Sequence, residues 1–405
     1  MKALTLSLLG CIFSLVVQLD YISPRGGSTS KTRFWRGIPF AQPPIRELRF
    51  KPPRKPHDAL YRTIVSAVDP APFCMQESQK FISEDCLTLD VVIPLDSYPH
   101  SNLPVIVYLN HDPSPLSSSD HKLANDVALV TSGLDAVVVT INYRVGVFAR
   151  LNGINLGLLD QQMALEWVQR YIMLFNGHPS RVTIVAFSVA THYIRLQMLA
   201  KPQKALFNSV ILLEPSLFGE FTLEQPQPPV SGVSLLQNVI SRLECPIKRP
   251  LTCLMKADSD DLLQASIGID FTSDLKHSYP YPESYFVGEY RKVRILELST
   301  YSRHCGLLNG VSDMAFKKYG IDVVRLSFGT ESQLLDTFWQ NYERIEDSVG
   351  KVFVDVLTRF LNDRNMMIDR EVFSLVTDSF TISTEYRTNH CPYQVSSNDK
   401  NKMNK

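Results

Sequence analysis

The stretch TIVAFSVATH, residues 183–192, places one serine between two kinds of secondary structure. The apolar residues before Ser188 favour a strand, and those after it favour a helix. A sharp strand-to-helix turn exposes a serine hydroxyl for attack on a carbonyl carbon, and normally carries glycine on both sides. Both positions hold alanine here, Ala186 and Ala190. Ser188 is therefore a candidate nucleophile in an altered turn, or a residue that only caps the following helix.

One histidine lies close enough in sequence to act on this serine. His192 follows Ser188 by one helical turn, so the two side chains share a helix face. An imidazole there could accept the hydroxyl proton, but no acidic residue is apparent to orient it. We interpret His192 as a helix-surface residue.

The surrounding elements follow an alternating order. Four apolar stretches rich in Val and Ile predict strands, at 103–109, 136–143, 181–187 and 209–214. The stretch 158–175 between the second and third carries apolar residues at helical spacing. This pattern predicts an α/β fold with a central, mostly parallel sheet flanked by helices.

Two further segments have their own composition. The proline-rich segment 39–56 predicts an extended surface stretch with solvated arginines and lysines. The polar region 226–292 indicates a helical insertion above the sheet.

Composition narrows the classes of partner. The chain of 405 residues has 41 Lys plus Arg and 41 Asp plus Glu, so its formal net charge is zero. Nucleic-acid binding calls for a basic excess, which is lacking. The nine histidines are scattered and no cysteine pair has zinc-ligand spacing, so we expect no metal and no cofactor.

The amino terminus resembles a secretion signal. One lysine precedes an apolar run from Ala3 to Val17, which suits a signal peptide over residues 1–19, although an uncleaved anchor remains an alternative. We expect one domain over 20–392, a disordered tail over 393–405, and a secreted protein with no later transmembrane segment.

The cysteines fit an oxidising compartment. Cys74 and Cys86, and likewise Cys245 and Cys253, are close enough in sequence to close short loops. Cys305 and Cys391 remain as a third pair or as two free thiols.

Four long motifs together resemble the carboxylesterase type B family, which includes cholinesterases and neuroligins. They are FWRGIPFAQPPIRELRFKPP, SEDCLTLDVVIP, VVVTINYRVGVFARL and GLLDQQMALEWVQRYIMLFNGHPSRVTI, in the order that the family has them. The resemblance is strong from residue 34 to about 218 and returns faintly near residues 375–388. It implies an α/β-hydrolase fold and both disulfides. It also implies that the last strands and the C-terminal helix of the family are missing.

The resemblance also indicates where the family's chemistry is altered. Its oxyanion segment H-G-G-G corresponds to Asn110, His111, Asp112 and Pro113, and its elbow G-E-S-A-G corresponds to residues 186–190. Val189 supplies the remaining candidate N–H donor. The family's acidic residue falls at Cys305 or His304, and its catalytic histidine lies beyond the last ordered element, because His390 comes too early.

These replacements predict a catalytically inactive, carboxylesterase-like protein that is secreted and acts by binding an unknown protein partner. The first alternative is a weak serine esterase that hydrolyses carboxylic esters through Ser188. The second is a truncated gene product without selected activity.

Overall fold

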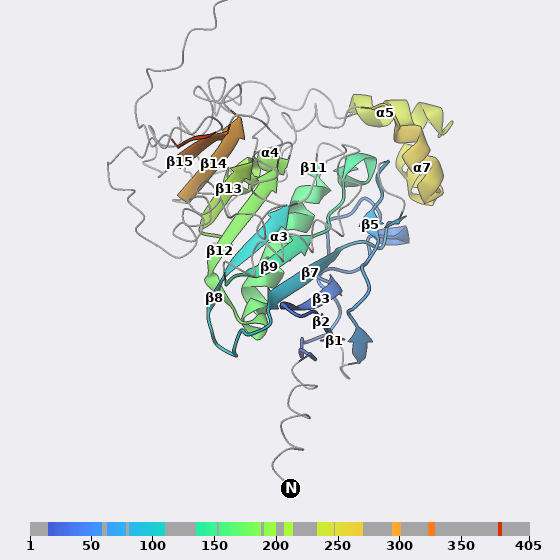
Figure 1. Cartoon of the computed structure of the whole chain (residues 1–405). Coiled ribbons are helices and arrows are strands. Elements are labelled where there is room, and N and C mark those ends of the chain that lie inside the picture. The colour runs from blue at the N-terminus through green and yellow to red at the C-terminus, as the bar shows by residue number, and fades with distance from the viewer. Residues whose placement is uncertain are drawn as a thin grey trace, which may run out of the picture.

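One large sheet organises the molecule (Figure 1). The computed structural model describes residues 15–58, 63–77, 81–109, 135–151, 154–187, 190–199, 206–213, 233–246, 248–269, 294–300, 323–328 and 380–382. Within them the strand order is β16-β15-β14-β13-β12-β8-β9-β7-β3-β2. The strands are β2 (Gly27–Ser28), β3 (Thr32–Pro39), β7 (Thr88–Pro94), β8 (Leu103–Leu109), β9 (Val137–Ile141), β12 (Gly177–Phe187), β13 (Ser209–Leu213), β14 (Arg294–Thr300), β15 (Val323–Phe328) and β16 (Phe380–Ile382).

The centre of the sheet is parallel and its two sides are antiparallel. Neighbouring strands from β15 to β9 pair in parallel. The pairs β9–β7, β7–β3, β3–β2 and β15–β16 are antiparallel. Parallel strands are covered on both faces, which explains why β8 and β9 are almost wholly apolar and buried. The four predicted strands are β8, β9, β12 and β13, and the predicted fold class is confirmed.

Among the described residues, three short strand pairs lie outside the large sheet. The strand β1 (Ser23–Arg25) runs parallel to β4 (Ile64–Ser66). The strand β5 (Phe73–Cys74) pairs with β6 (Ile82–Ser83), and β10 (Arg150–Leu151) forms a small hairpin with β11 (Ile154–Asn155).

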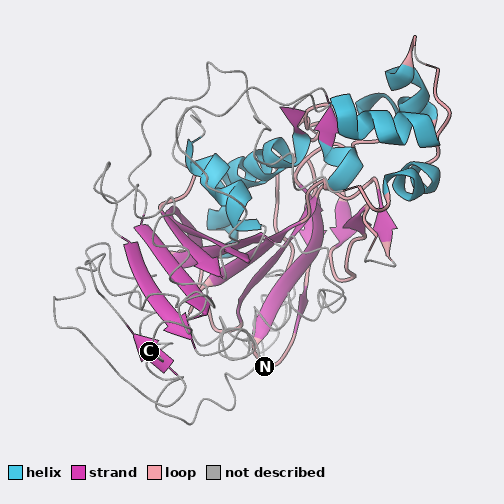
Figure 2. Ribbon diagram, turned by 90° about the horizontal axis from the view of Figure 1, so that it is seen from above, coloured by secondary structure: helices cyan, strands magenta, loops and turns pink. Residues whose placement is uncertain are grey.

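The helix α3 (Leu156–Tyr171) and the 3-10 turn η4 (Ile172–Phe175) fill the predicted helical stretch. Asn155 caps α3, because its Oδ1 accepts the Leu158 N–H at 3.3 Å. Gly157 lets α3 approach the chain after β9, since a Cβ there would lie 2.3 Å from the Arg144 carbonyl oxygen. The helix α4 (Ala190–Leu199) lies on the same face of the sheet, in contact with α3 (Figure 2).

A buried ion pair fixes α3 to the end of β9. The Asp160 carboxylate accepts bonds from the Arg144 backbone N–H, from Nε at 2.8 Å and from a terminal guanidinium nitrogen at 2.7 Å. The Arg144 guanidinium also donates to the Lys51 carbonyl. Both side chains are almost completely buried. Such a pair holds its elements in one geometry, because breaking it would leave an uncompensated buried charge.

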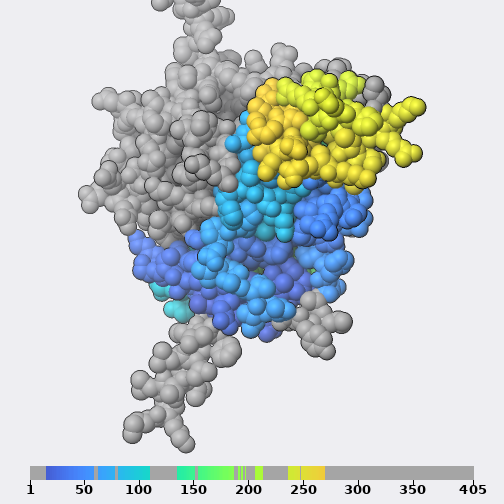
Figure 3. Space-filling view, turned by 90° about the vertical axis from the view of Figure 1, so that its right-hand side faces the viewer, coloured from blue at the N-terminus to red at the C-terminus, as the bar shows by residue number. Residues whose placement is uncertain are grey.

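Three further helices form the insertion that the polar region predicts. They are α5 (Val233–Arg242), α6 (Pro250–Lys256) and α7 (Ser259–Ser266). They share a second apolar cluster with the region around Phe50, Met75 and Phe148, separate from the main core between α3 and the sheet. In the space-filling view this segment, in yellow, lies against blue amino-terminal residues (Figure 3).

Candidate active site

The strand and the helix around the candidate nucleophile are present. The strand β12 ends at Phe187 and α4 begins at Ala190, so Ser188 and Val189 form the whole connection and lie outside the described residues. Ala186 and Ala190 are completely buried. Their methyl groups therefore occupy the packed interface of strand and helix, where the turn motif normally carries glycine.

The register of the sheet brings the predicted oxyanion segment to the same edge. Leu109, the last residue of β8, pairs in parallel with Ala186 of β12. Asn110 to Pro113 follow directly, although they lie outside the described residues. Parallel strands present their carboxyl ends at one edge, which is where α/β folds bind ligands. The chain therefore leaves β8 and β12 at neighbouring positions of the sheet, just before residues 110–113 and Ser188.

Two tyrosines pack behind this edge. Tyr193 of α4 and Tyr143, which follows β9, lie edge to face with ring centroids 5.7 Å apart. Burial raises the pKa of Tyr143 well above its usual range. Burial also raises the pKa of Tyr193, although the Arg150 charge and the nearby Asn155 side chain oppose that shift. Both phenols therefore stay protonated, and their rings pack against each other.

Gln197 ties the two helices together beneath the site. Its Nε2 donates to the Leu158 carbonyl at 2.8 Å, and the side chain is buried. The amide thus satisfies a backbone acceptor in α3 and fixes how α4 lies against α3. This helix–helix bond was not foreseen from the sequence, because nothing in the spacing of Gln197 indicates its distant partner.

The remaining predicted site residues fall outside the described part of the chain. They are His304, Cys305, His390 and Cys391. His192 lies within α4, but its side chain is not among those described. The acid and base positions therefore remain sequence-based predictions.

Both predicted disulfides are present. Cys74–Cys86 spans a Cα–Cα distance of 5.0 Å, and Cys245–Cys253 spans 5.7 Å. The loops that the two disulfides close both lie next to the second apolar cluster, which contains Met75 and Cys245. Among the described residues there is no group of side chains with metal-ligand geometry. No helix in the described ranges is long and apolar enough to cross a membrane.

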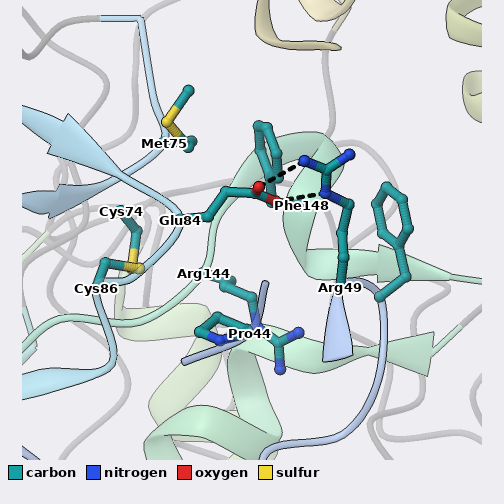
Figure 4. A pocket seen from close by; sticks show the side chains of 9 residues that line it. Pro44, Arg49, Cys74, Met75, Glu84, Cys86, Arg144 and Phe148 are labelled. Carbon is teal, nitrogen blue, oxygen red and sulfur yellow. Dashed lines mark hydrogen bonds and ion pairs between the residues drawn. A yellow bond between two sulfur atoms is a disulfide. The ribbon is translucent and has the colours of Figure 1, made fainter. Parts of the chain in front are cut away.

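A small pocket beside the first disulfide shows one prediction to be wrong. The proline-rich segment was expected to carry solvated arginines, yet Arg49 is 8% exposed. Its guanidinium binds both Glu84 carboxylate oxygens at 2.6 Å (Figure 4). It also donates to the Leu254, Met255 and Ala257 carbonyls. Sequence composition could not reveal this, because the partners lie at distant positions in the chain.

Comparison with known proteins identifies the family. The sequence profile of the carboxylesterase family matches residues 20–390. This chain belongs to the carboxylesterase family. Its scaffold is that of the α/β-hydrolase fold, and a solved thermophilic pNB esterase has a TM-score of 0.59 and 25% identity. That alignment covers 71% of this chain and 63% of the esterase.

Several curated relatives are cholinesterases or esterases. Acetylcholinesterase 4 of Caenorhabditis briggsae is 29% identical over 266 residues, covering 60% of this chain and 43% of that protein. The para-nitrobenzyl esterase of Bacillus subtilis is 32% identical over 214 residues, covering 49% of this chain and 43% of the esterase. The crystal protein of Dictyostelium discoideum is 36% identical over 202 residues, covering 46% of this chain and 36% of that protein. This carboxylesterase-family chain thus spans less than half the length of these relatives.

Proposed function

We propose that this member of the carboxylesterase family is a secreted protein that binds another protein and does not turn over esters. The observation that carries the proposal is the segment Asn110–Pro113 after β8. The pairing of Leu109 with Ala186 makes this segment leave the sheet next to the strand that leads to Ser188. Its chemistry therefore bears directly on any reaction of that serine.

The segment 110–113 is poorly suited to form an oxyanion hole. Attack by a serine creates a negative oxygen that backbone N–H groups must stabilise. Pro113 has no N–H to donate, and the Asp112 carboxylate places negative charge in the same short segment. Loss of one oxyanion donor costs about 10²–10³ in rate, and a nearby anion adds to that loss.

The turn itself supports the same conclusion. The methyl groups of Ala186 and Ala190 are fully buried between β12 and α4. Val189, between Ser188 and the helix, is β-branched and stiff at χ1. A serine on this connection retains a hydroxyl, but the surrounding residue types restrict the sharp turn that exposes it.

The disulfides support the proposal that the protein is secreted. Two of them close within the described residues, and disulfides persist in the secretory pathway and outside the cell. A folded domain that does not turn over substrate can still present its surface to another protein. For this reason we assign a protein-binding role.

Organophosphate labelling tests the proposal. The purified chain and its Ser188→Ala variant are incubated with a fluorescent organophosphate, and ester turnover is measured in parallel. We expect no labelling that depends on Ser188 and no turnover above that of the variant. Stoichiometric labelling that disappears in Ser188→Ala would sink the proposal.

Variants that restore the oxyanion hole give a positive control. In the double variant Asp112→Gly/Pro113→Gly, a donor returns and the carboxylate is removed, so labelling of Ser188 should become detectable where the parent chain shows none. The triple variant that also carries Ser188→Ala should not label. Equal labelling of parent and double variant would mean that this segment does not limit the chemistry.

The second candidate is a serine esterase acting through Ser188. Relatives named as esterases and the retained order of strand, short connection and helix favour it. The Ser188 oxygen would attack the ester carbonyl and release the alcohol, and water would then release the acid. Slow turnover of small carboxylic esters that Ser188→Ala abolishes is the outcome that favours this candidate.

A further inference from the structure

The folded domain begins before the point where the sequence places the end of a leader. The apolar start of the chain suggests a leader over residues 1–19, yet the described structure starts at Leu15 and includes the whole stretch from there. Residues 15–19 run antiparallel to the residues around β1, with a bridge between Val16 and Arg25.

Backbone hydrogen bonds hold this stretch along its length. The Val17 N–H donates to the Pro24 carbonyl at 3.1 Å, and the Leu19 N–H donates to the Ile22 carbonyl at 2.9 Å. The Leu15 carbonyl accepts two bonds, from the Gly26 N–H at 2.9 Å and from the Trp35 indole N–H at 2.8 Å. The indole nitrogen is a donor only, so in this structure the Leu15 carbonyl satisfies it.

The side chains alternate as a half-buried strand requires. Val17 is 8% exposed and Leu19 is 1% exposed, whereas Gln18 between them points to solvent. Val17, Leu19 and Tyr21 belong to the main apolar core together with Trp35. The Trp167 indole N–H also donates to the Tyr21 hydroxyl, which fixes the end of the stretch against α3.

The surface around Gly26 and β3 fits closely against residues 15–19. Gly26 lies so close to β3 that a Cβ would meet the Phe34 carbonyl oxygen at 2.1 Å and the Trp35 ring at 2.8 Å. Just after the stretch, the Asp20 carboxylate pairs with Arg170 and accepts a bond from the Tyr171 hydroxyl at 3.0 Å. Contacts therefore reach from residue 15 to residue 20 without interruption.

We propose that residues 15–19 are a permanent extended segment of the mature domain, and that any leader is removed at or before the Ser14–Leu15 peptide bond. Removal hydrolyses one peptide bond with one water, leaving a carboxylate on the leader and a new α-amino group on the domain. The apolar residues available before Leu15 still match the h-region of a signal peptide. Cleavage after Leu19 would instead leave the Trp35 indole N–H unsatisfied and a groove where Val17 and Leu19 lie.

Mass spectrometry of the mature amino terminus tests the proposal directly. The full chain is produced in secretory cells, and the first peptide of the protein from the medium and from the cell extract is identified. A first residue at or before Leu15, including an uncleaved Met1, supports the proposal. A folded protein that begins between Val16 and Asp20 overturns it.

A pair of substitutions gives an independent measurement. Leu19→Ala opens a cavity in the core and should lower the thermal midpoint of the purified protein by roughly 5 °C, whereas Asp69→Asn at an exposed position should shift it by less than about 1 °C. A substitution in a removed segment cannot alter the mature protein, so equal midpoints for Leu19→Ala and the parent contradict the proposal. If Leu19→Ala does not yield folded protein, the milder Leu19→Val is compared in the same way.

Discussion

At the scale of single residues, Asp90 of β7 carries a half-buried carboxyl group in the large sheet. Its Oδ1 accepts the Gly37 N–H at 2.8 Å. Burial raises the pKa of Asp90 to about 6, with the Gly37 hydrogen bond and the nearby Arg36 charge opposing the shift.

This raised pKa predicts a pH dependence with a definite sign. The folded state binds the Asp90 proton more tightly than the unfolded state, so its contribution to stability is present at low pH and is lost as pH rises through about 6. Asp90→Asn keeps the acceptor for Gly37 and removes the charge. We expect this variant to be more stable than the parent at pH 8, by roughly 1–2 kcal/mol after allowing for partial exposure, with a smaller gain at pH 5.

Urea unfolding at the two pH values measures the effect. The exposed Asp69→Asn serves as the matched control, because it makes the same chemical change on the surface. A gain for Asp90→Asn that is equal at pH 5 and pH 8 would show that Asp90 does not titrate between them.

At the scale of elements, Arg49 joins three segments that are far apart in the chain. It follows the 3-10 turn η1 (Arg46–Leu48), pairs with Glu84 beside the first disulfide, and binds the carbonyls at the end of α6. These carbonyls belong to the last turn of a helix, where a positive charge also meets the negative end of the dipole. One side chain therefore holds the insertion α5–α7 against the body of the protein.

Removing that side chain should loosen the insertion. Arg49→Leu leaves the Glu84 carboxylate without its cation and the α6 carbonyls without their donor, so we expect a loss of about 3–5 kcal/mol in the free energy of unfolding. Arg49→Lys keeps the charge but loses the bidentate contact with Glu84. Its free energy of unfolding should lie between those of Arg49→Leu and the parent.

Hydrogen exchange locates this effect. Peptides from α5–α7 should exchange faster in Arg49→Leu, while those from β8 and β9 change less. The exposed Arg54→Leu is the control, since it removes an arginine of the same proline-rich segment. Equal exchange in Arg49→Leu and Arg54→Leu would rule out the linking role.

At the scale of the whole molecule, two apolar clusters and two disulfides stabilise the part of the chain that the structure describes. The main cluster lies between α3 and the sheet, and the second lies beneath α5–α7. The first disulfide touches both regions, since Cys74 and Cys86 are in the main cluster and Met75 is in the second. The first disulfide therefore lies where the two clusters meet, and packing joins them.

This arrangement predicts that stability depends on an oxidising compartment. The double variant Cys74→Ser/Cys86→Ser should lose about 2–4 kcal/mol, because the reduced chain gains conformational freedom when unfolded. Thermal unfolding of the secreted proteins measures the loss. Cys11→Ser, in the expected leader, is the control and should behave like the parent. An unchanged midpoint in the double variant would show that the scaffold does not need the link.

Several features could be predicted from the residues because they are local or long motifs. The strands β8, β9, β12 and β13 are continuous apolar runs, and α3 has a clear helical period. The pairing of cysteines near in sequence also follows from short loops. The buried role of Arg49, the α4-to-α3 bond of Gln197 and the strand at residues 15–19 could not be read in this way. Each depends on partners that only folding brings near.

The sequence by itself determined the fold class, the family and the residue types around Ser188, because these reside in residue types and their order along the chain. Tertiary structure decided which polar residues are buried and how residues 15–19 bond and pack against the domain. An apolar run such as the one ending at Val17 suits a leader and a strand equally well. Only the partners supplied by Pro24, Gly26 and Trp35 distinguish them, since a backbone that is bonded and buried cannot be removed without cost.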